Sequence, residues 1–175
     1  MEVFLFYIAG FVSLTATMLV ITRMNASHAL IYLIISLLAI AVIFYLLGAP
    51  FAAALEIVIY AGAIMVLFLF VVMMLNLGRS SVDQEQHWFL PRMWVMPGIL
   101  TTILLLEMIY LLVAPTSSAG ISSSGTAVSP KEVGITLFGP YLITVELASI
   151  LLLASLVGTY HLGRRYLRAR REEIA

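Results

Sequence analysis

The sequence predicts an all-α integral membrane protein with five transmembrane helices. Hydrophobic residues make up 63% of the 175 residues and charged residues only 10%, whereas soluble domains are close to half apolar and about one quarter charged. The apolar residues are collected in five long runs, and the charges are concentrated in the connections and the C-terminal tail. A chain with so little polar surface is expected to use the bilayer as its solvent.

Each predicted span is a long, predominantly apolar run, because about 20 helical residues cross a hydrocarbon core of about 30 Å. Residues Arg79–Arg92 read as a polar loop, and the Ser- and Gly-rich stretch Pro115–Pro130 as an irregular connection. We expect Lys131–Gly139 to lie at the membrane interface. The five predicted spans are Val3–Thr22, His28–Gly48, Phe51–Leu77, Met93–Ala114 and Pro140–Leu162.

The basic residues predict the orientation of the chain. Residues 1–163 form the expected membrane domain, and residues 164–175 form a basic tail with five arginines. If this tail is cytoplasmic, eight of the nine Lys and Arg residues lie inside and only Lys131 lies outside. Cytoplasmic connections of membrane proteins carry an excess of Lys and Arg. The N-terminus is therefore predicted to be periplasmic and the C-terminus cytoplasmic.

Composition also limits the chemistry of the chain. The absence of cysteine excludes disulfides, thiolate metal sites, iron–sulfur ligation and covalent haem attachment. His28 and His161 both fall near the predicted inner boundary, where a bis-His haem is conceivable, but we interpret each as an interfacial residue. The sequence has no phosphate loop or dinucleotide fingerprint. We therefore predict no catalytic residue, no bound cofactor or metal, and no nucleic-acid partner.

Three carboxylates lie inside predicted spans: Glu56, Glu107 and Glu146. A central charge costs about 3 kcal/mol on insertion scales, which the apolar remainder of each helix can offset. All three are predicted to lie about 8–10 Å below the outer boundary, at a rise of about 1.5 Å per residue. They could form a protonatable layer. Alternatively, each reaches the outer interface or pairs with a cation of a neighbouring subunit, and Glu107 is best placed to reach the interface.

The third span is the most informative element. Its 27 residues would measure about 40 Å as a straight helix, which exceeds the hydrocarbon thickness. Tilt could absorb the excess, and so could a π-bulge, which lodges an extra residue and often marks a functional site. Glu56 and Tyr60 are four residues apart and so share one face of an α-helix, below the flexible Gly62. This pattern suits a gated proton path, or a small-residue packing seam with two buried polar groups.

Two blocks of the sequence resemble a known family. Residues 28–39 (HALIYLIISLLA), 47–68 (LGAPFAAALEIVIYAGAIMVLF) and 72–78 (VMMLNLG) form the first block. Residues 133–142 (VGITLFGPYL) and 145–154 (VELASILLLA) form the second. Together they resemble the subunit J family of the bacterial proton-pumping NADH:quinone oxidoreductase, respiratory complex I, the counterpart of mitochondrial NADH dehydrogenase subunit 6. Ala26 stands where many relatives have proline, and Glu107 matches no motif of the family.

The resemblance implies a non-catalytic, multi-pass subunit of the translocase in a bacterial inner membrane, where it couples quinone reduction to proton translocation. Subunits A, H, K and N of the same complex are its implied partners, and the chain itself would bind no flavin, NADH or iron–sulfur cluster. In this family the third helix can carry a π-bulge that is proposed to gate proton access. That role falls on Tyr60, Gly62 and Val66, and the proton path on Glu56, Tyr60 and Glu146. A subunit of a multisubunit cation/proton antiporter and a purely structural scaffold are the alternatives.

Overall fold

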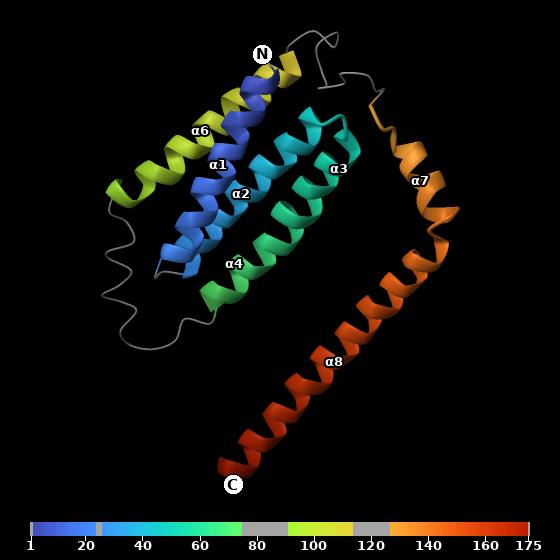
Figure 1. Cartoon of the computed structure of the whole chain (residues 1–175). Helices are drawn as coiled ribbons and strands as arrows, with labels where there is room; N and C mark the ends of the chain where they lie inside the picture. Colours follow the sequence, from blue (N-terminus) through green and yellow to red (C-terminus); the bar gives the residue numbers. More distant parts are fainter. Residues whose placement is uncertain (1, 24–25, 75–90, 114–126, 175) are drawn as a thin grey trace. The chain divides into compact units, whose positions relative to one another are not determined.

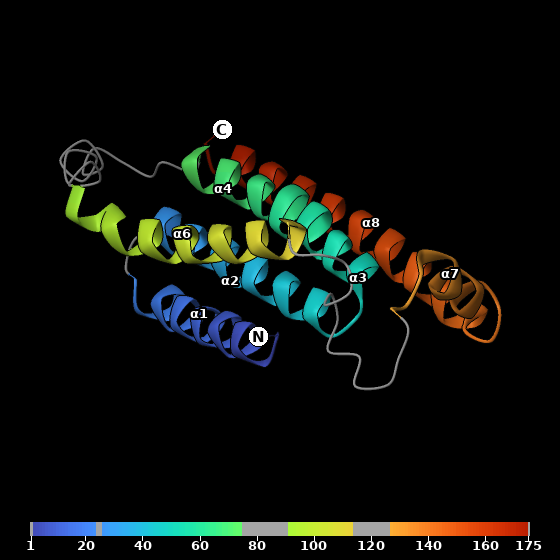
Figure 2. The ribbon, with the colours of Figure 1, turned by 90° about the horizontal axis from the view of Figure 1, so that it is seen from above.

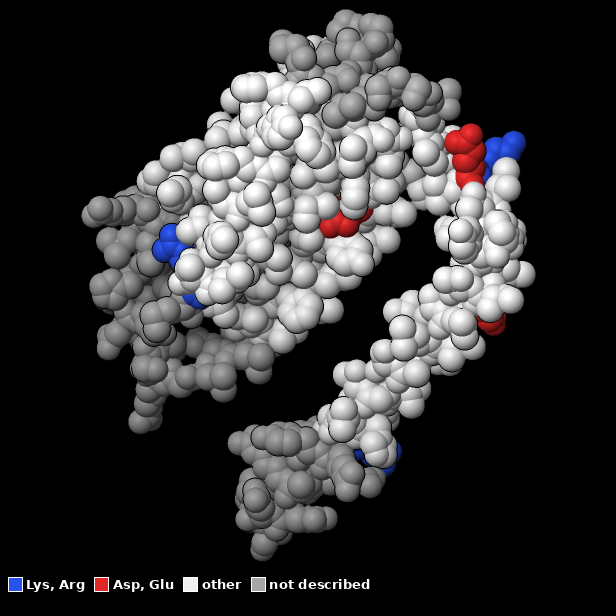
Figure 3. Space-filling view, in the orientation of Figure 1, with Lys and Arg blue, Asp and Glu red and all other residues white. Residues whose placement is uncertain are grey.

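The structure is a computed structural model that describes residues 2–23, 26–74, 91–113 and 127–174, and all regular structure within these ranges is helical (Figure 1). The described residues contain five helices that are long and apolar enough to cross a membrane, which confirms the predicted fold class. Most described atoms on the face seen in Figure 3 are uncharged, as a lipid-facing surface requires. The five spans are Val3–Thr22, Ala26–Leu46, Pro50–Met74, Trp94–Val113 and Leu142–Arg164.

The observed spans differ from the predicted ones mainly at their ends. The second helix begins at Ala26 and ends at Leu46, and the fifth begins at Leu142 rather than Pro140. The predicted end of the third span, Leu75–Leu77, lies outside the described residues, as does most of the predicted loop Arg79–Arg92. Such differences of one or two residues are normal at helix ends.

The described helices belong to two compact units, Met1–Ser129 and Pro130–Ala175. The second unit consists of α7 (Pro130–Phe138) and α8 (Leu142–Ile174). The helices of the first unit are α1 (Glu2–Thr22), α2 (Ala26–Leu46), α3 (Pro50–Leu55), η1 (Glu56–Ile64), α4 (Met65–Met74) and α6 (Pro91–Val113).

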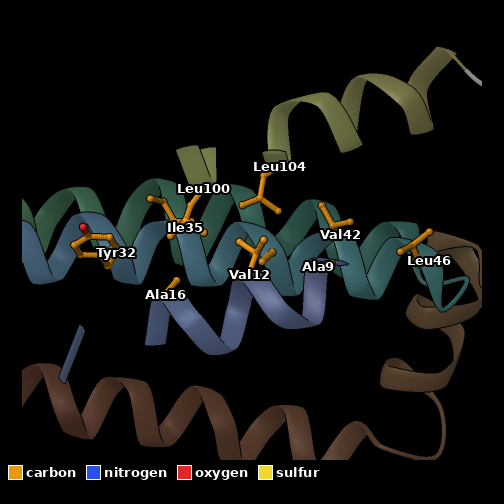
Figure 4. Packing of buried hydrophobic residues seen from close by; sticks show 10 residues of the cluster. Ala9, Val12, Ala16, Tyr32, Ile35, Val42, Leu46, Leu100 and Leu104 are labelled. Atoms are coloured by element: carbon orange, nitrogen blue, oxygen red, sulfur yellow. The ribbon is translucent and has the colours of Figure 1, made fainter. Parts of the chain in front are cut away.

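Within the first unit, α2 is the central helix and contacts α1, the continuous helix α3–η1–α4, and α6 (Figure 2). The core of the unit lies where α1, α2 and α6 meet (Figure 4). Small side chains bring the backbones of α1 and α2 close together, since Ala9, Ala16 and Ala39 are fully buried. The core cluster comprises Ala9, Val12, Ala16, Tyr32, Ile35, Ala39, Val42, Leu46, Leu100 and Leu104.

Hydroxyl groups add polar contacts between α1 and α2. The buried Ser36 Oγ lies 2.9 Å from Thr17 Oγ1 and 3.3 Å from Ser13 Oγ, and each pair shares a hydrogen bond. In lipid, hydrogen bonds between helices contribute about 0.6–2 kcal/mol each. The two helices therefore form a hairpin that is held by close packing together with a small hydroxyl cluster.

A glycine turn ends α2 and starts the third span. Gly48 has a φ of +81°, a left-handed conformation that glycine adopts without steric cost. Ala49 N–H donates to the carbonyl of Phe44 at 3.0 Å and Gly48 N–H to that of Tyr45 at 3.1 Å, which is the Schellman pattern. Pro50 then occupies the first turn of α3, where a missing N–H costs nothing. The turn reverses the chain so that the third span packs back along α2.

Most side chains of the fifth span are exposed. None of the most apolar window of Leu142–Arg164 is buried, and its described side chains are exposed apart from the partly exposed Val145 and Gly158. The helix continues without a break through the basic segment to Ile174. Within the second unit, its apolar surface is therefore left to lipid or to other protein surfaces.

We predict that the connection before α7 faces the periplasm and that Arg164 faces the cytoplasm, because of the eight-to-one bias of basic residues. The chain has no native cysteine, so single-cysteine variants report on one position each. Cysteine at the exposed Ala127 should react with an impermeant maleimide when only the outer membrane is permeabilised. The matched variant Arg164→Cys should react only after the inner membrane is disrupted. The reverse pattern of labelling would contradict the orientation.

Candidate functional site

The third span contains a π-helical segment of nine residues, η1 (Glu56–Ile64), between α3 and α4. In a π-helix each N–H bonds to the carbonyl five residues earlier, and such segments are rare and often functional. The N–H of Met65, just after the segment, still bonds to the carbonyl of Tyr60 and also to that of Gly62. The sequence places the distorted turn at Tyr60–Val66. The π-helix begins earlier, at Glu56, and Val66 lies in α4.

Gly62 is the glycine of this π-helix and lies close to the backbone of the preceding turn. A Cβ atom added there would lie 3.1 Å from the carbonyl oxygen of Ile57, five residues earlier. In the i to i+5 pattern this carbonyl is the hydrogen-bond acceptor of residue 62 itself. A side chain at position 62 therefore crowds the acceptor that the π-helix needs, and glycine is the residue that avoids the contact.

The side chains of Glu56 and Tyr60 differ in their exposure. The Glu56 side chain is partly buried, whereas Tyr60 is 52% exposed. The expectation that they share one face assumes an α-helix, in which residues four apart are stacked. In the π-helical register the residue whose N–H bonds to the Glu56 carbonyl is Ala61 rather than Tyr60, and Ala61 is buried. Glu56 therefore borders the interior of the unit, while Tyr60 projects from it.

An apolar pocket of about 220 Å³ lies beside the start of the π-helix, between α2, the third span and α6. Ile57 of the π-helix and Met108 of α6 contribute to its walls. Since protein interiors contain few voids larger than a water molecule, the pocket is space into which neighbouring side chains can move. Its walls are formed by Ala41, Val42, Tyr45, Pro50, Ala53, Ala54, Ile57, Met108, Leu111 and Leu112.

The other two membrane carboxylates differ from each other. Glu146 lies on α8 of the second unit, where its side chain is exposed. Glu107 is only 4% exposed, so the expectation that it reaches the outer interface is wrong. It lies three residues after Leu104 and so shares the face of α6 that packs on the core. That Glu56, Glu107 and Glu146 form one layer stays a prediction.

The two candidate haem-ligating histidines belong to different units. His28 is buried, and its ring packs edge-to-face on Trp94 of α6, with ring centroids 5.9 Å apart. The interpretation of His28 as an interfacial residue stays a prediction, and the structure adds that α6 covers its ring. His161 lies on α8 and is exposed. Among the residues that the structure describes, no three His, Asp or Glu side chains lie close enough together to hold a metal ion.

These features define a class of protein: a multi-pass helical membrane protein whose third span carries a π-helix beside a partly buried carboxylate. Comparison with known proteins identifies the family of the chain within this class. Residues 16–162 match the family described as NADH-ubiquinone/plastoquinone oxidoreductase chain 6. The chain belongs to this family.

Curated relatives extend the match over almost the whole chain. The NADH-quinone oxidoreductase subunit J of Pseudomonas aeruginosa is 59% identical over 162 residues, which cover 93% of this chain and 96% of the relative. Subunit J of Escherichia coli strain K12 is 57% identical over 161 residues, covering 92% and 86% respectively. Subunit J of a Buchnera aphidicola strain from Acyrthosiphon pisum is 49% identical over 91% of this chain and 92% of its own length.

Proposed function

We propose that this chain is a membrane-arm subunit of the proton-translocating NADH:quinone oxidoreductase in a bacterial inner membrane. The observation that carries the proposal is the similarity to subunit J proteins along nearly the full length of both chains. The five apolar helices suit an integral part of a membrane complex. In this proposal the chain carries no redox group and works through its helices, with subunits A, H, K and N as its partners.

The π-helix is the part that we propose to act as a gate. Conversion of one π-turn into α-helix changes the register by one residue, which rotates the helix beyond it by about 100°. For a change centred on Gly62, the rotated part is α4, which begins at Met65. Val66 and the residues after it would then present another side to their neighbours. A local change in hydrogen bonding thus becomes a change in which side chains line a path.

Two features of the first unit support such a change. Gly62 leaves the π-form free of a side-chain contact with the Ile57 carbonyl and is also compatible with an α-helix. The pocket beside Ile57 provides volume for side chains that shift when the register changes. Packed interiors have discrete arrangements rather than continuous ones. The π- and α-forms are therefore suited to be two states of a switch.

The proton path that we propose runs past the gate. Glu56, at the first position of the π-helix, is the carboxylate that the conversion would move relative to its surroundings. Tyr60 projects from the same segment and can pass a proton through its hydroxyl group. Glu146, on α8, is the third member of the proposed path. Ionisable residues inside membrane spans commonly mark proton relays.

The test of the proposed function is the composition of the native complex. A tag on the C-terminal end of this chain, followed by purification under mild detergent, should recover subunits that carry flavin and iron–sulfur clusters. The preparation should oxidise NADH with a quinone acceptor. A tagged complex that contains only membrane subunits and no redox centre would identify the chain as part of a cation/proton antiporter and overturn the proposal.

A further inference from the structure

Glu107 is a buried carboxylate that the proposed proton path does not use. It lies in the second half of α6 and is 4% exposed. Both of its carboxylate oxygens are buried and have no hydrogen-bond partner among the residues that the structure describes. Buried polar groups are nearly always paired, so an unpaired buried carboxylate needs a physical explanation.

The residues of α6 near Glu107 that pack on the core are apolar. Leu100 and Leu104 on the same face of α6 belong to the core cluster with α1 and α2, and Met108 and Leu111 pack against that cluster. The spans of α1 and α2 contain no Lys, Arg, Asp or Glu between Val3 and Thr22 or between Ala26 and Leu46. No cation of these neighbouring spans can therefore neutralise an ionised Glu107.

The titratable groups near this interface lie at its other end. His28 of α2 packs on Trp94, which precedes Glu107 by about 13 residues, or about 20 Å along the helix axis. Arg23, just after α1, packs on Tyr32, which is one turn after His28. At such separations neither group can form a hydrogen bond or an ion pair with Glu107.

We infer that Glu107 is a proton-binding site that is occupied when the interface of α1, α2 and α6 is packed, so that the side chain is a neutral carboxylic acid. Transfer of an isolated ionised carboxylate into an apolar site is so unfavourable that the group takes up a proton instead. The burial of Glu107 comes from this chain alone. A neighbouring subunit therefore cannot supply a cation to its oxygens without displacing these helices.

The position of this acid connects it to the pocket beside the π-helix. Met108, the next residue of α6, lines that pocket, and so does Ile57, the residue after Glu56. A proton leaves Glu107 only when water or a cation reaches its buried oxygens.

The test is infrared spectroscopy of the assembled membrane complex with Glu107→Gln, in ordinary and in heavy water. A protonated carboxylic acid has a carbonyl stretching band that is distinct from the carboxylate bands and that shifts on deuteration. Glutamine has nearly the same size as glutamic acid and is neutral, so packing is preserved. We expect the variant to lose the intensity of one protonated carboxyl group and to keep all of its carboxylate intensity.

Two further variants make the result specific. Glu132→Gln makes the same chemical change at an exposed residue of α7 and should leave the protonated-acid bands unchanged. Glu107→Leu, which introduces an apolar side chain of similar size, should lose the same band if Glu107→Gln fails to assemble. Loss of carboxylate intensity, or unchanged protonated-acid bands, in either Glu107 variant would overturn the inference. The readout is independent of turnover, so it stands apart from the proposed function.

Discussion

Deletion of this chain is expected to abolish NADH oxidation with quinone as acceptor, while NADH oxidation with hydrophilic acceptors continues in any surviving peripheral arm. The reason is that electron entry and the quinone-coupled reaction depend on different parts of the complex. The chain has no cysteine, and iron–sulfur clusters are held by cysteine thiolates, so electron entry does not depend on it. The quinone-coupled reaction depends on an intact membrane arm, in which we place the five helices of this chain.

Both rates should be measured on membranes of the deletion strain and normalised to the flavin content. Complementation with the wild-type chain should restore the quinone-linked rate to its original value, which excludes effects on neighbouring genes. Retention of more than about half of the quinone-linked rate in the deletion strain would show that the chain is dispensable for coupling.

Replacement of Gly62 by leucine should lower proton pumping and quinone-linked turnover about tenfold, with little effect on assembly. The added Cβ would lie 3.1 Å from the Ile57 carbonyl oxygen in the π-form, which crowds the hydrogen-bond acceptor of that register. Overpacking of this kind costs about 1–3 kcal/mol, which corresponds to a shift of about 5- to 150-fold in the ratio of two states. The variant should therefore be held in the α-form.

The matched control is Gly10→Leu. Gly10 is a helical glycine of α1, and a Cβ added there meets no atom within 4 Å beyond the neighbouring backbone of its own helix. Complex content should be quantified by blue-native electrophoresis, and pumping by the quenching of a pH-sensitive dye during NADH oxidation. If Gly62→Leu complex assembles normally and pumps at the rate of the Gly10→Leu complex, the gate is excluded and a scaffold role for the third span is favoured.

The spans were predictable because an apolar run of sufficient length has few other stable structures in a bilayer. The excess length of the third span, together with Gly62 at its middle, also indicated a distortion in the segment that is π-helical. The start of this segment at Glu56 was not predictable, because the hydrogen-bond register of a helix leaves no trace in its hydrophobicity. Helix α7 was missed as well, since its nine residues are too few to span.

The burial of Glu107 was not predictable either, for a different reason. A single carboxylate near the end of an apolar helix fits an interfacial position as well as a buried one. Which applies depends on the face that the helix turns to its neighbours, and α6 turns the face with Leu100 and Leu104 toward α2 and α1. When every side of a span is apolar, that choice is made by tertiary packing and not by an amphipathic pattern.

The α1–α2 hairpin has a consequence for biogenesis. These two helices make the most extensive helix–helix contact among the described residues, and their hydroxyl groups bond to each other. Because α1 and α2 follow each other directly in the chain, they can pair before the later described helices are made. The hairpin then offers α2 as a packing surface to the third span and to α6. Insertion of the first unit can therefore proceed by adding later helices to a pair that is already formed.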